Sequence, residues 1–152
     1  MKAVTHENTA DGVIIYSVYG ENRDQVVLIR QYRYPIDGYI YEFPAGLVEQ
    51  GEDFKEAGVR ELKEETGIDV DEQSLFLMYH YRDDKRHCIY YAFRAETTMD
   101  TAVHLQLGET MDSQFLPEDE FINLIESDRF VPSEQGRFAL FKERIVNSLF
   151  HN

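Results

Sequence analysis

Two runs of β-branched and aromatic residues near the start of the chain predict a β-hairpin. Gly12 to Tyr19 reads GVIIYSVY, Gln25 to Arg33 reads QVVLIRQYR, and a turn-like GENRD segment separates them. A third short strand is expected over Tyr39 to Phe43, directly before Pro44. Because proline has no backbone N–H to donate, we expect the strand to end there.

Further apolar runs predict the remaining strands. Ser74 to Tyr81 and His87 to Ala95 flank a charged RDDKR loop, and Val103 to Phe115 is a less regular run interrupted near Gly108. The only cysteine, Cys88, lies in one of these runs, so it cannot form an intramolecular disulfide and is interpreted as a buried apolar side chain.

A helix is expected over roughly Asp53 to Thr66. Asp53 and Glu56 have the spacing of a capping box, and Gly67 stands where a left-handed C-terminal cap is expected. The apolar stripe that we expect to pack on the sheet consists of Phe54, Ala57, Gly58 and Leu62.

Two more helices are expected near the end of the chain, and we interpret both as architectural. Pro117 is expected to begin the first, and Ser133 is expected to cap the second. The apolar face of the first holds Phe121, Leu124 and Ile125, and that of the second holds Phe138, Phe141, Ile145 and Leu149. Strands flanked by helices indicate an α/β fold with a mixed sheet.

Length and composition indicate a single packed domain over residues 1–152. The hydrophobic fraction is 43%, and 10 Tyr and 10 Phe residues supply bulky side chains for a core. No apolar run approaches the roughly 20 residues of a membrane span, and the first ten residues lack the apolar centre of a signal peptide. We therefore expect a cytoplasmic protein that does not enter a membrane.

The net charge of −14 disfavours nonspecific binding to nucleic acid or to an anionic membrane surface. An anionic substrate would need metal ions and a few arginines to reverse the local field. The arginines available near the expected site are Arg30, Arg33, Arg82 and Arg86.

The expected first helix carries an unusual density of carboxylates. Like charges one turn apart oppose helix formation, and a multivalent cation would remove that conflict. Glu61 and Glu65 are i,i+4 neighbours with Glu64 between them, so three carboxylates can converge on oxygen-ligated Mg²⁺ or Mn²⁺. Taken singly, each glutamate would be interpreted as part of a solvated helix face.

The segment from residue 46 to 68 reads G-x5-E-x7-R-E-L-x-E-E-x-G-I, and it closely resembles the signature of the Nudix hydrolases. The matching residues are Gly46, Glu52, Arg60, Glu61, Leu62, Glu64, Glu65, Gly67 and Ile68. The resemblance implies an α/β/α sandwich that hydrolyses a diphosphate linked to another group, using a divalent metal, Mg²⁺ or Mn²⁺.

The resemblance also implies roles for individual residues. Glu61 and Glu65 are the expected metal ligands, with Glu64 as a ligand, as the base or as a group that orients the base, and the carbonyl of Ala45 as an additional ligand. Arg60 cannot ligate a metal because its guanidinium only donates. We expect it to hold carboxylates in place by pairing with Glu56, Glu64 or Glu52.

A general base outside this helix is common in the family, on a loop before the last part of the sheet. Glu109 is the best-placed candidate, with Asp112 and Glu118 as weaker substitutes. The alternative is that Glu109 only solvates a turn after Gly108.

The sequence before the motif is similar to the Nudix subgroup that acts on ADP-ribose and other nucleoside diphosphate sugars. Arg33 is then expected to contact substrate phosphates or a ribose, unless it forms only a salt bridge at a strand end. Tyr32 and Arg30 are further candidates for substrate binding. This subgroup often carries a proline about 16 residues beyond the motif, which is absent here. A homodimer is a further expectation from the resemblance.

Two other functions stay open from the sequence. One is a MutT-like nucleoside triphosphate pyrophosphohydrolase, which would release pyrophosphate. The other is a noncatalytic module that senses nucleotide sugars.

Overall fold

A computed structural model describes residues 11–19, 24–97 and 111–151 of the chain. Its strands are β1 (Gly12–Tyr19), β2 (Gln25–Arg33), β3 (Gly38–Glu42), β4 (Ala45–Leu47), β5 (Leu75–Asp83), β6 (Cys88–Glu96) and β7 (Met111–Pro117). Its α-helices are α1 (Phe54–Thr66), α2 (Glu118–Ile125) and α3 (Pro132–Phe150). Single 3-10 turns cover Tyr34–Ile36 and Glu72–Ser74.

The strands form one mixed sheet with the order β3-β2-β1-β6-β5. The predicted hairpin is confirmed, since β1 and β2 pair antiparallel with Ser17 opposite Val27. β1 and β6 run parallel, and β5 pairs antiparallel with β6. β7 pairs along β2, whose second half also pairs with β3.

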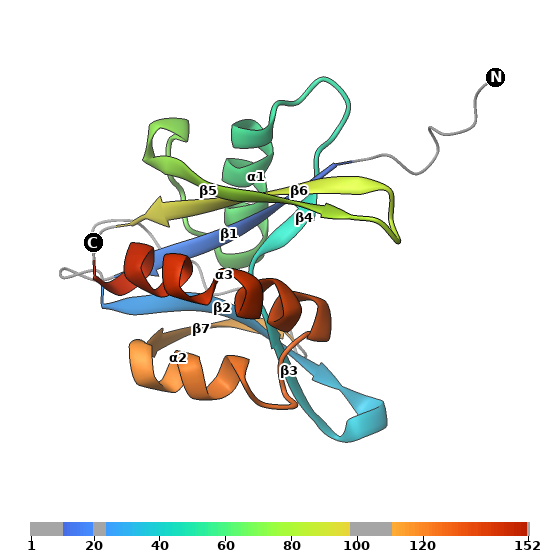
Figure 1. The fold of residues 1–152 in the computed structure, drawn as a ribbon, viewed down its shortest axis with the longest axis vertical. Helices are drawn as coiled ribbons and strands as arrows, with labels where there is room; N and C mark the ends of the chain where they lie inside the picture. The colour runs from blue at the N-terminus through green and yellow to red at the C-terminus, as the bar shows by residue number, and fades with distance from the viewer. Residues whose placement is uncertain (1–10, 20–23, 98–110, 152) are drawn as a thin grey trace.

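The strand β4 was not predicted from the sequence. Pro44 follows the end of β3 as expected, but the chain returns to the sheet at once, and Ala45 pairs with Ile14 of β1. β6 pairs along one edge of β1. On the other edge, the first residues of β1 pair with β4 and the last residues pair with β2. This short strand matters because it places the backbone that precedes α1 alongside that acidic helix (Figure 1).

The sheet is covered on both faces by helices, which confirms the expected α/β/α sandwich (Figure 1). Alternate residues of β1 point to opposite faces, as the period of a strand requires. Ile14 and Tyr16 belong to the core under α2 and α3, whereas Val13 and Ile15 belong to the core under α1. Cys88 is buried in the first of these cores, as expected.

The ends of α1 are those that the sequence predicts. The Asp53 carboxylate accepts a hydrogen bond from the N–H of Glu56 at 2.8 Å, and the Glu56 carboxylate accepts one from the N–H of Asp53 at 2.9 Å. Gly67 adopts φ 79°, which favours glycine, and caps the C-terminus. The buried residues of the stripe are Ala57, Gly58 and Leu62, with Phe54 packed at the edge of the same core.

The predicted cap of the last helix is wrong. Ser133 does not cap α3: the N-cap residue is Val131, and its side chain makes no capping hydrogen bond. Pro132 instead occupies the first turn, where its fixed φ suits a helix start and its missing N–H costs nothing. The expected apolar face is confirmed in Phe138, Ile145 and Leu149, which are buried.

The last expected strand is described only in part. β7 begins at Met111, so the first part of the predicted run from Val103 lies outside the described residues. The candidate base Glu109 lies outside them as well.

Candidate functional site

Arg60 lies at the centre of a network of carboxylates in the candidate site. Its Nε and Nη2 donate to the two oxygens of Glu52 at 2.8 and 2.9 Å, a paired geometry that only a guanidinium can make. Its Nη1 donates to Glu61 at 2.7 Å and to Glu64 at 3.1 Å. Nη2 also reaches the carbonyl of Leu47 at 3.0 Å. The expected pairing with Glu56 does not occur, because Glu56 belongs to the helix cap.

Glu61 and Glu65 both lie against β4. The backbone N–H of Ala45 donates to Glu65 Oε1 at 2.9 Å. A Cβ atom placed on Gly46 would lie 2.1 Å from the carboxylate carbon of Glu61, so only glycine lets this side chain approach the strand. The structure therefore gathers the two expected metal ligands beside the Ala45–Gly46 backbone.

The protonation of these groups reflects their burial. Burial, together with the nearby charges of Glu61, Glu42 and Glu64, raises the pKa of Glu65 to about 8, although the hydrogen bond from Ala45 acts in the opposite direction. Burial also raises the pKa of Glu61, with Arg60 acting in the opposite direction. The hydrogen bond from Arg60 lowers the pKa of Glu52. Glu65 thus occupies a place where a nearby cation would strongly favour its charged form.

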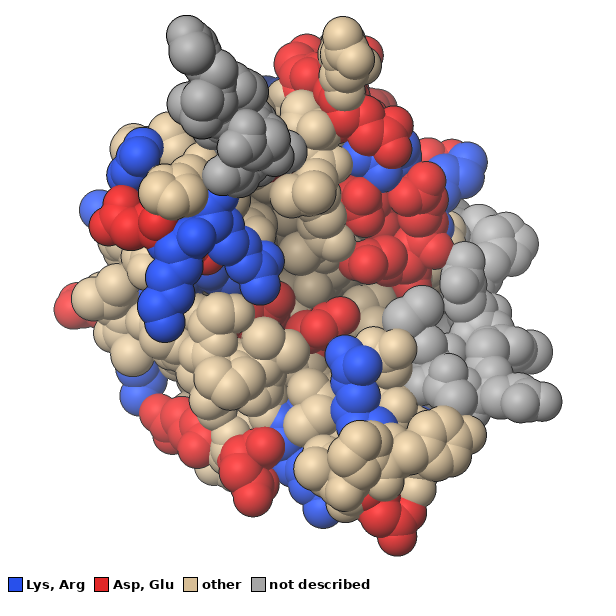
Figure 2. Space-filling model, turned by 90° about the vertical axis from the view of Figure 1, so that its right-hand side faces the viewer, with Lys and Arg blue, Asp and Glu red and all other residues tan. Residues whose placement is uncertain are grey.

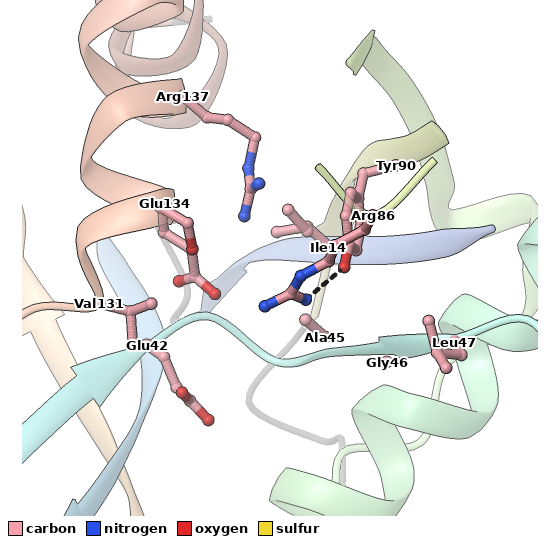
Figure 3. A pocket seen from close by; sticks show the side chains of 11 residues that line it. Ile14, Glu42, Ala45, Gly46, Leu47, Arg86, Tyr90, Val131, Glu134 and Arg137 are labelled. Atoms are coloured by element: carbon pink, nitrogen blue, oxygen red, sulfur yellow. Dashed lines mark hydrogen bonds between the residues drawn. The ribbon is translucent and has the colours of Figure 1, made fainter. Parts of the chain in front are cut away.

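A cavity of about 260 Å³ adjoins this segment (Figure 3). Its walls come from β1, β3, β4, the β5–β6 hairpin and the start of α3, and both acidic and basic side chains line it. The polar residues on its wall are Glu42, Arg86, Tyr90, Ser133, Glu134 and Arg137. The surface around this region is hollowed, with acidic side chains along one edge and basic side chains along the other (Figure 2).

Glu134 and Arg137 were not predicted, since we interpreted α3 as architectural. Glu134 is buried, and its Oε1 accepts a hydrogen bond from the N–H of Phe43 at 2.8 Å. Burial raises its pKa to about 8. The signal in the sequence was the pair of charged residues at i,i+3 just after Pro132, on the same helix as the apolar face.

The expected substrate residues on β2 lie beside this region, at the hairpin formed with β3. Arg30 stacks over the ring of Tyr39 with its guanidinium 4.1 Å from the ring centre. The Tyr32 hydroxyl donates to Asp37, and its ring contacts Tyr34 and Tyr39 edge-on. Arg33 lies close enough to Glu42 to lower the pKa of that carboxyl, which burial raises. None of these three residues lines the cavity.

Two further arginines, Arg82 and Arg86, were candidates from the sequence, and of these two Arg86 lies on the cavity wall. Its Nη1 donates to the Tyr90 hydroxyl at 2.9 Å. Arg82 instead pairs with Asp84 on the exposed hairpin.

A sequence profile described as NUDIX domain matches residues 8–137, which is most of the chain. The chain belongs to the NUDIX domain family. The Nudix resemblance of the sequence is thereby confirmed.

Relatives of this Nudix domain carry different names. The chain is 30% identical to the methanol dehydrogenase activator of Bacillus methanolicus over 69% of its own length and 52% of the relative. It is 28% identical to the ADP-ribose pyrophosphatase of Bacillus subtilis over 75% of its length and 56% of the relative. The chain thus spans only about half the length of these two relatives.

A solved structure of MutT, from work on Aliivibrio salmonicida and Vibrio cholerae, has a similar fold. It superposes with a TM-score of 0.68 at 22% identity, covering 91% of this chain and 98% of that one. This similarity supports the fold of the Nudix domain.

The donor groups of the Nudix domain fit a hard divalent cation, which prefers carboxylate and carbonyl oxygens. Glu61, Glu64 and Glu65 would hold it, together with the carbonyl of Ala45. In the described part of the chain these side chains do not surround one point: Glu61 and Glu64 pair with Arg60, and Glu65 with the Ala45 amide. The burial of Glu65 and the carboxylates near it both disfavour its charged form, and a bound cation would offset both effects.

None of the helices described in this Nudix domain combines the length and the hydropathy needed to cross a bilayer.

Proposed function

We propose that the chain is a metal-dependent hydrolase that cleaves the diphosphate of a nucleoside diphosphate sugar, with ADP-ribose as the favoured substrate. The products would be AMP and ribose 5-phosphate. The observation that carries this proposal is the gathering of Glu61 and Glu65 on β4, beside a cavity that contains both arginines and carboxylates. The name of the Bacillus subtilis relative supports the choice of ADP-ribose.

The reaction adds water across a phosphoanhydride, so one P–O bond forms at the attacked phosphorus and the bridging P–O bond breaks. Bound divalent cations, Mg²⁺ or Mn²⁺, would lower the pKa of the attacking water and neutralise charge on the departing oxygen. Glu61, Glu65, Glu64 and the Ala45 carbonyl would hold them. Arg60 keeps Glu61 and Glu64 oriented through its hydrogen bonds.

Removal of a proton from the attacking water is assigned to Glu109, with Glu64 as the alternative. Glu64 is half-exposed, with 58% of its side chain accessible, so it can meet solvent water. Replacing Glu109 with glutamine separates the two assignments. A large fall in turnover with unchanged metal dependence supports Glu109, whereas unchanged turnover moves the task to Glu64 or to another group.

Substrate contacts on the β2–β3 side are assigned to Arg33, Tyr32 and Arg30. Their position at the hairpin beside Glu42 supports contact with the part of the substrate that extends beyond the metal site. A cytoplasmic location and a homodimer remain predictions from the sequence.

The test is a substrate panel with products identified by mass. Purified protein is incubated with MgCl₂ or MnCl₂ and ADP-ribose, other nucleotide sugars, dinucleotides or nucleoside triphosphates. AMP and ribose 5-phosphate from ADP-ribose are expected. Turnover of triphosphates alone, with release of pyrophosphate, would show a MutT-like enzyme instead. A folded protein that binds ADP-ribose but releases no product would show a sensing module.

A further inference from the structure

Arg137 is a buried cation that forms no salt bridge with any described residue, although its charge acts on the nearby Glu134. Its side chain is only 6% exposed, and its Nε has no hydrogen-bond partner. Its guanidinium lies over the rings of Tyr90 and Tyr81, 5.0 and 5.5 Å from their centres. Aromatic faces offset only part of the cost of burying a charge. The remaining donors of Arg137 are therefore suited to an anionic ligand.

The side chain of Arg137 points into the cavity beside β4, and Arg86 points toward the same space from the β5–β6 hairpin (Figure 3). Tyr90 lies between them: Arg86 donates to its hydroxyl at 2.9 Å, and Arg137 covers its ring. Tyrosine packing and hydrogen bonding thus fix both guanidiniums before any ligand arrives. Two arginines with planar sets of donors match the oxygens of a phosphate group, in the diphosphate of the substrate or in the sugar phosphate product.

The cavity lining also carries acceptors. Glu134, one turn before Arg137 on α3, and Glu42 at the end of β3 both line the cavity (Figure 3). Glu134 uses Oε1 to accept from the N–H of Phe43, and no described residue donates to its second oxygen. A carboxyl group keeps oxygen atoms that accept hydrogen bonds from hydroxyl groups in both its protonated and its ionised form. The cavity therefore combines donors that suit a phosphate with acceptors that suit hydroxyl groups.

A nucleobase fits this cavity less well than a sugar does. An open aromatic face is the best surface for base stacking. Among the described residues that line the cavity, Tyr90 is the one aromatic residue, and the guanidinium of Arg137 already lies over its ring. The apolar part of the lining is limited to the small or aliphatic residues Ile14, Ala45, Leu47 and Val131.

We propose that this cavity binds the sugar phosphate half of the substrate, with Arg137 and Arg86 on its phosphate and Glu134 and Glu42 on its hydroxyls. This inference rests on the proposed function, because it assigns one half of the nucleoside diphosphate sugar to a place next to the Ala45–Gly46 segment. It makes Arg137 and Arg86 residues that bind the substrate phosphate next to the sugar, and Glu134 and Glu42 residues that contact the sugar itself.

The experiment measures binding of ribose 5-phosphate and of AMP by calorimetry, without turnover, to the wild-type protein, R137Q and R86Q. R144Q is the matched control, because Arg144 is an exposed arginine on the same helix. Loss of one charge-assisted contact should weaken ribose 5-phosphate binding about tenfold in R137Q and in R86Q. Binding of AMP should stay unchanged in both variants, and R144Q should match the wild type.

Kinetics with ADP-ribose add a second measurement. R137Q should raise KM about tenfold and change kcat much less, since the contact forms in both the bound substrate and the transition state. Equal ribose 5-phosphate affinity in R137Q and the wild type would overturn the proposal, and so would a loss of AMP binding instead. If R137Q does not fold by circular dichroism, R86Q alone decides by the same criteria.

Failure of this inference is distinguishable from failure of the proposed function. A wild-type protein that hydrolyses ADP-ribose while R137Q and R86Q bind ribose 5-phosphate normally would refute only the subsite. A protein that binds ribose 5-phosphate through Arg137 but hydrolyses no nucleotide sugar would refute only the proposed activity.

Discussion

The backbone N–H of Ala45 donates a hydrogen bond to Oε1 of Glu65 across 2.9 Å. This contact connects the last turn of α1 to β4, so the strand that sequence reasoning missed is the one that positions the acidic helix. Glu65 is largely buried and lies near other carboxylates, and these two effects together raise its pKa to about 8. The fold thus holds Glu65 in a place that favours a bound cation over an isolated charge.

Replacing Glu65 with glutamine should abolish most metal-dependent activity while preserving the fold. The amide oxygen can still accept from Ala45, but it carries no charge to bind a cation. We expect turnover of ADP-ribose to fall by about 100-fold or more, in line with the loss of a metal ligand.

Turnover of ADP-ribose by E65Q across a series of Mg²⁺ concentrations measures the effect. E72Q, which removes an exposed carboxylate outside α1, is the control and should match the wild type. Near-normal rates for E65Q at limiting Mg²⁺ would contradict the ligand role.

Replacing Arg60 with lysine should weaken both the fold and the site. Lysine keeps the positive charge but cannot bond both oxygens of Glu52 while also reaching Glu61. We expect the free energy of unfolding to fall by about 1–3 kcal/mol, from the loss of hydrogen bonds to charged groups. The Mg²⁺ concentration for half-maximal activity should rise about tenfold, because Glu61 and Glu64 lose their orientation.

Urea denaturation and Mg²⁺ titration measure these two changes in Arg60→Lys. R144K on the exposed part of α3 is the control for the chemical substitution itself. An R60K protein with unaltered Mg²⁺ dependence would show that Arg60 supports only the fold.

Replacing Gly46 with alanine should impair the use of Mg²⁺, whereas replacing Gly136 with alanine should stabilise the protein. A Cβ on Gly46 would collide with the end of the Glu61 side chain, which can swing away, so G46A should fold but should need about tenfold more Mg²⁺ for half-maximal activity. Gly136 lies inside α3 with no atom within 4 Å of an added Cβ, so G136A should stabilise the protein by about 0.5–1 kcal/mol. Denaturation curves and Mg²⁺ titrations of both variants test this pair. If G46A showed wild-type Mg²⁺ dependence, the close packing of Glu61 on β4 would be irrelevant to activity.

Much of the sheet and all of α1 could be predicted because their signals are local. The β-branched runs of β1 and β2 and the Asp53–Glu56 capping box depend on neighbours in sequence, and each was placed within a residue or two. β4 could not be predicted because it has only three residues, and its pairing partner Ile14 lies about 30 positions earlier. The wrong cap at Ser133 has a related cause, since Pro132 satisfies the start of α3 without any side-chain bond.

The acidic half of the site could be predicted from spacing, whereas the cavity could not. Glu61 and Glu65 lie on one helix, so their separation in sequence fixes their proximity. Glu134 and Arg137 reach the cavity only because α3 packs across the sheet, and Tyr90 reaches it from β6. No spacing in the sequence connects these segments. Their apolar neighbours made α3 look architectural, although one turn of the same helix faces the cavity.

The stability of the protein should decrease as the pH rises, in part through Glu134. Burial raises the pKa of this carboxyl from 4.5 to about 8 in the folded protein. Between these two values the folded state holds a proton that the unfolded state releases, so the stabilisation present below pH 4.5 is lost as the pH rises through about 8. E134Q stays neutral at every pH and can still accept from the N–H of Phe43. The difference in unfolding free energy between E134Q and the wild type should therefore grow in favour of E134Q from pH 6 to pH 9.

Urea denaturation at pH 6, 7, 8 and 9 without metal measures this difference in unfolding free energy. E143Q, an exposed change on the same helix, is the control. A difference that does not vary with pH would mean that Glu134 stays ionised in the folded protein.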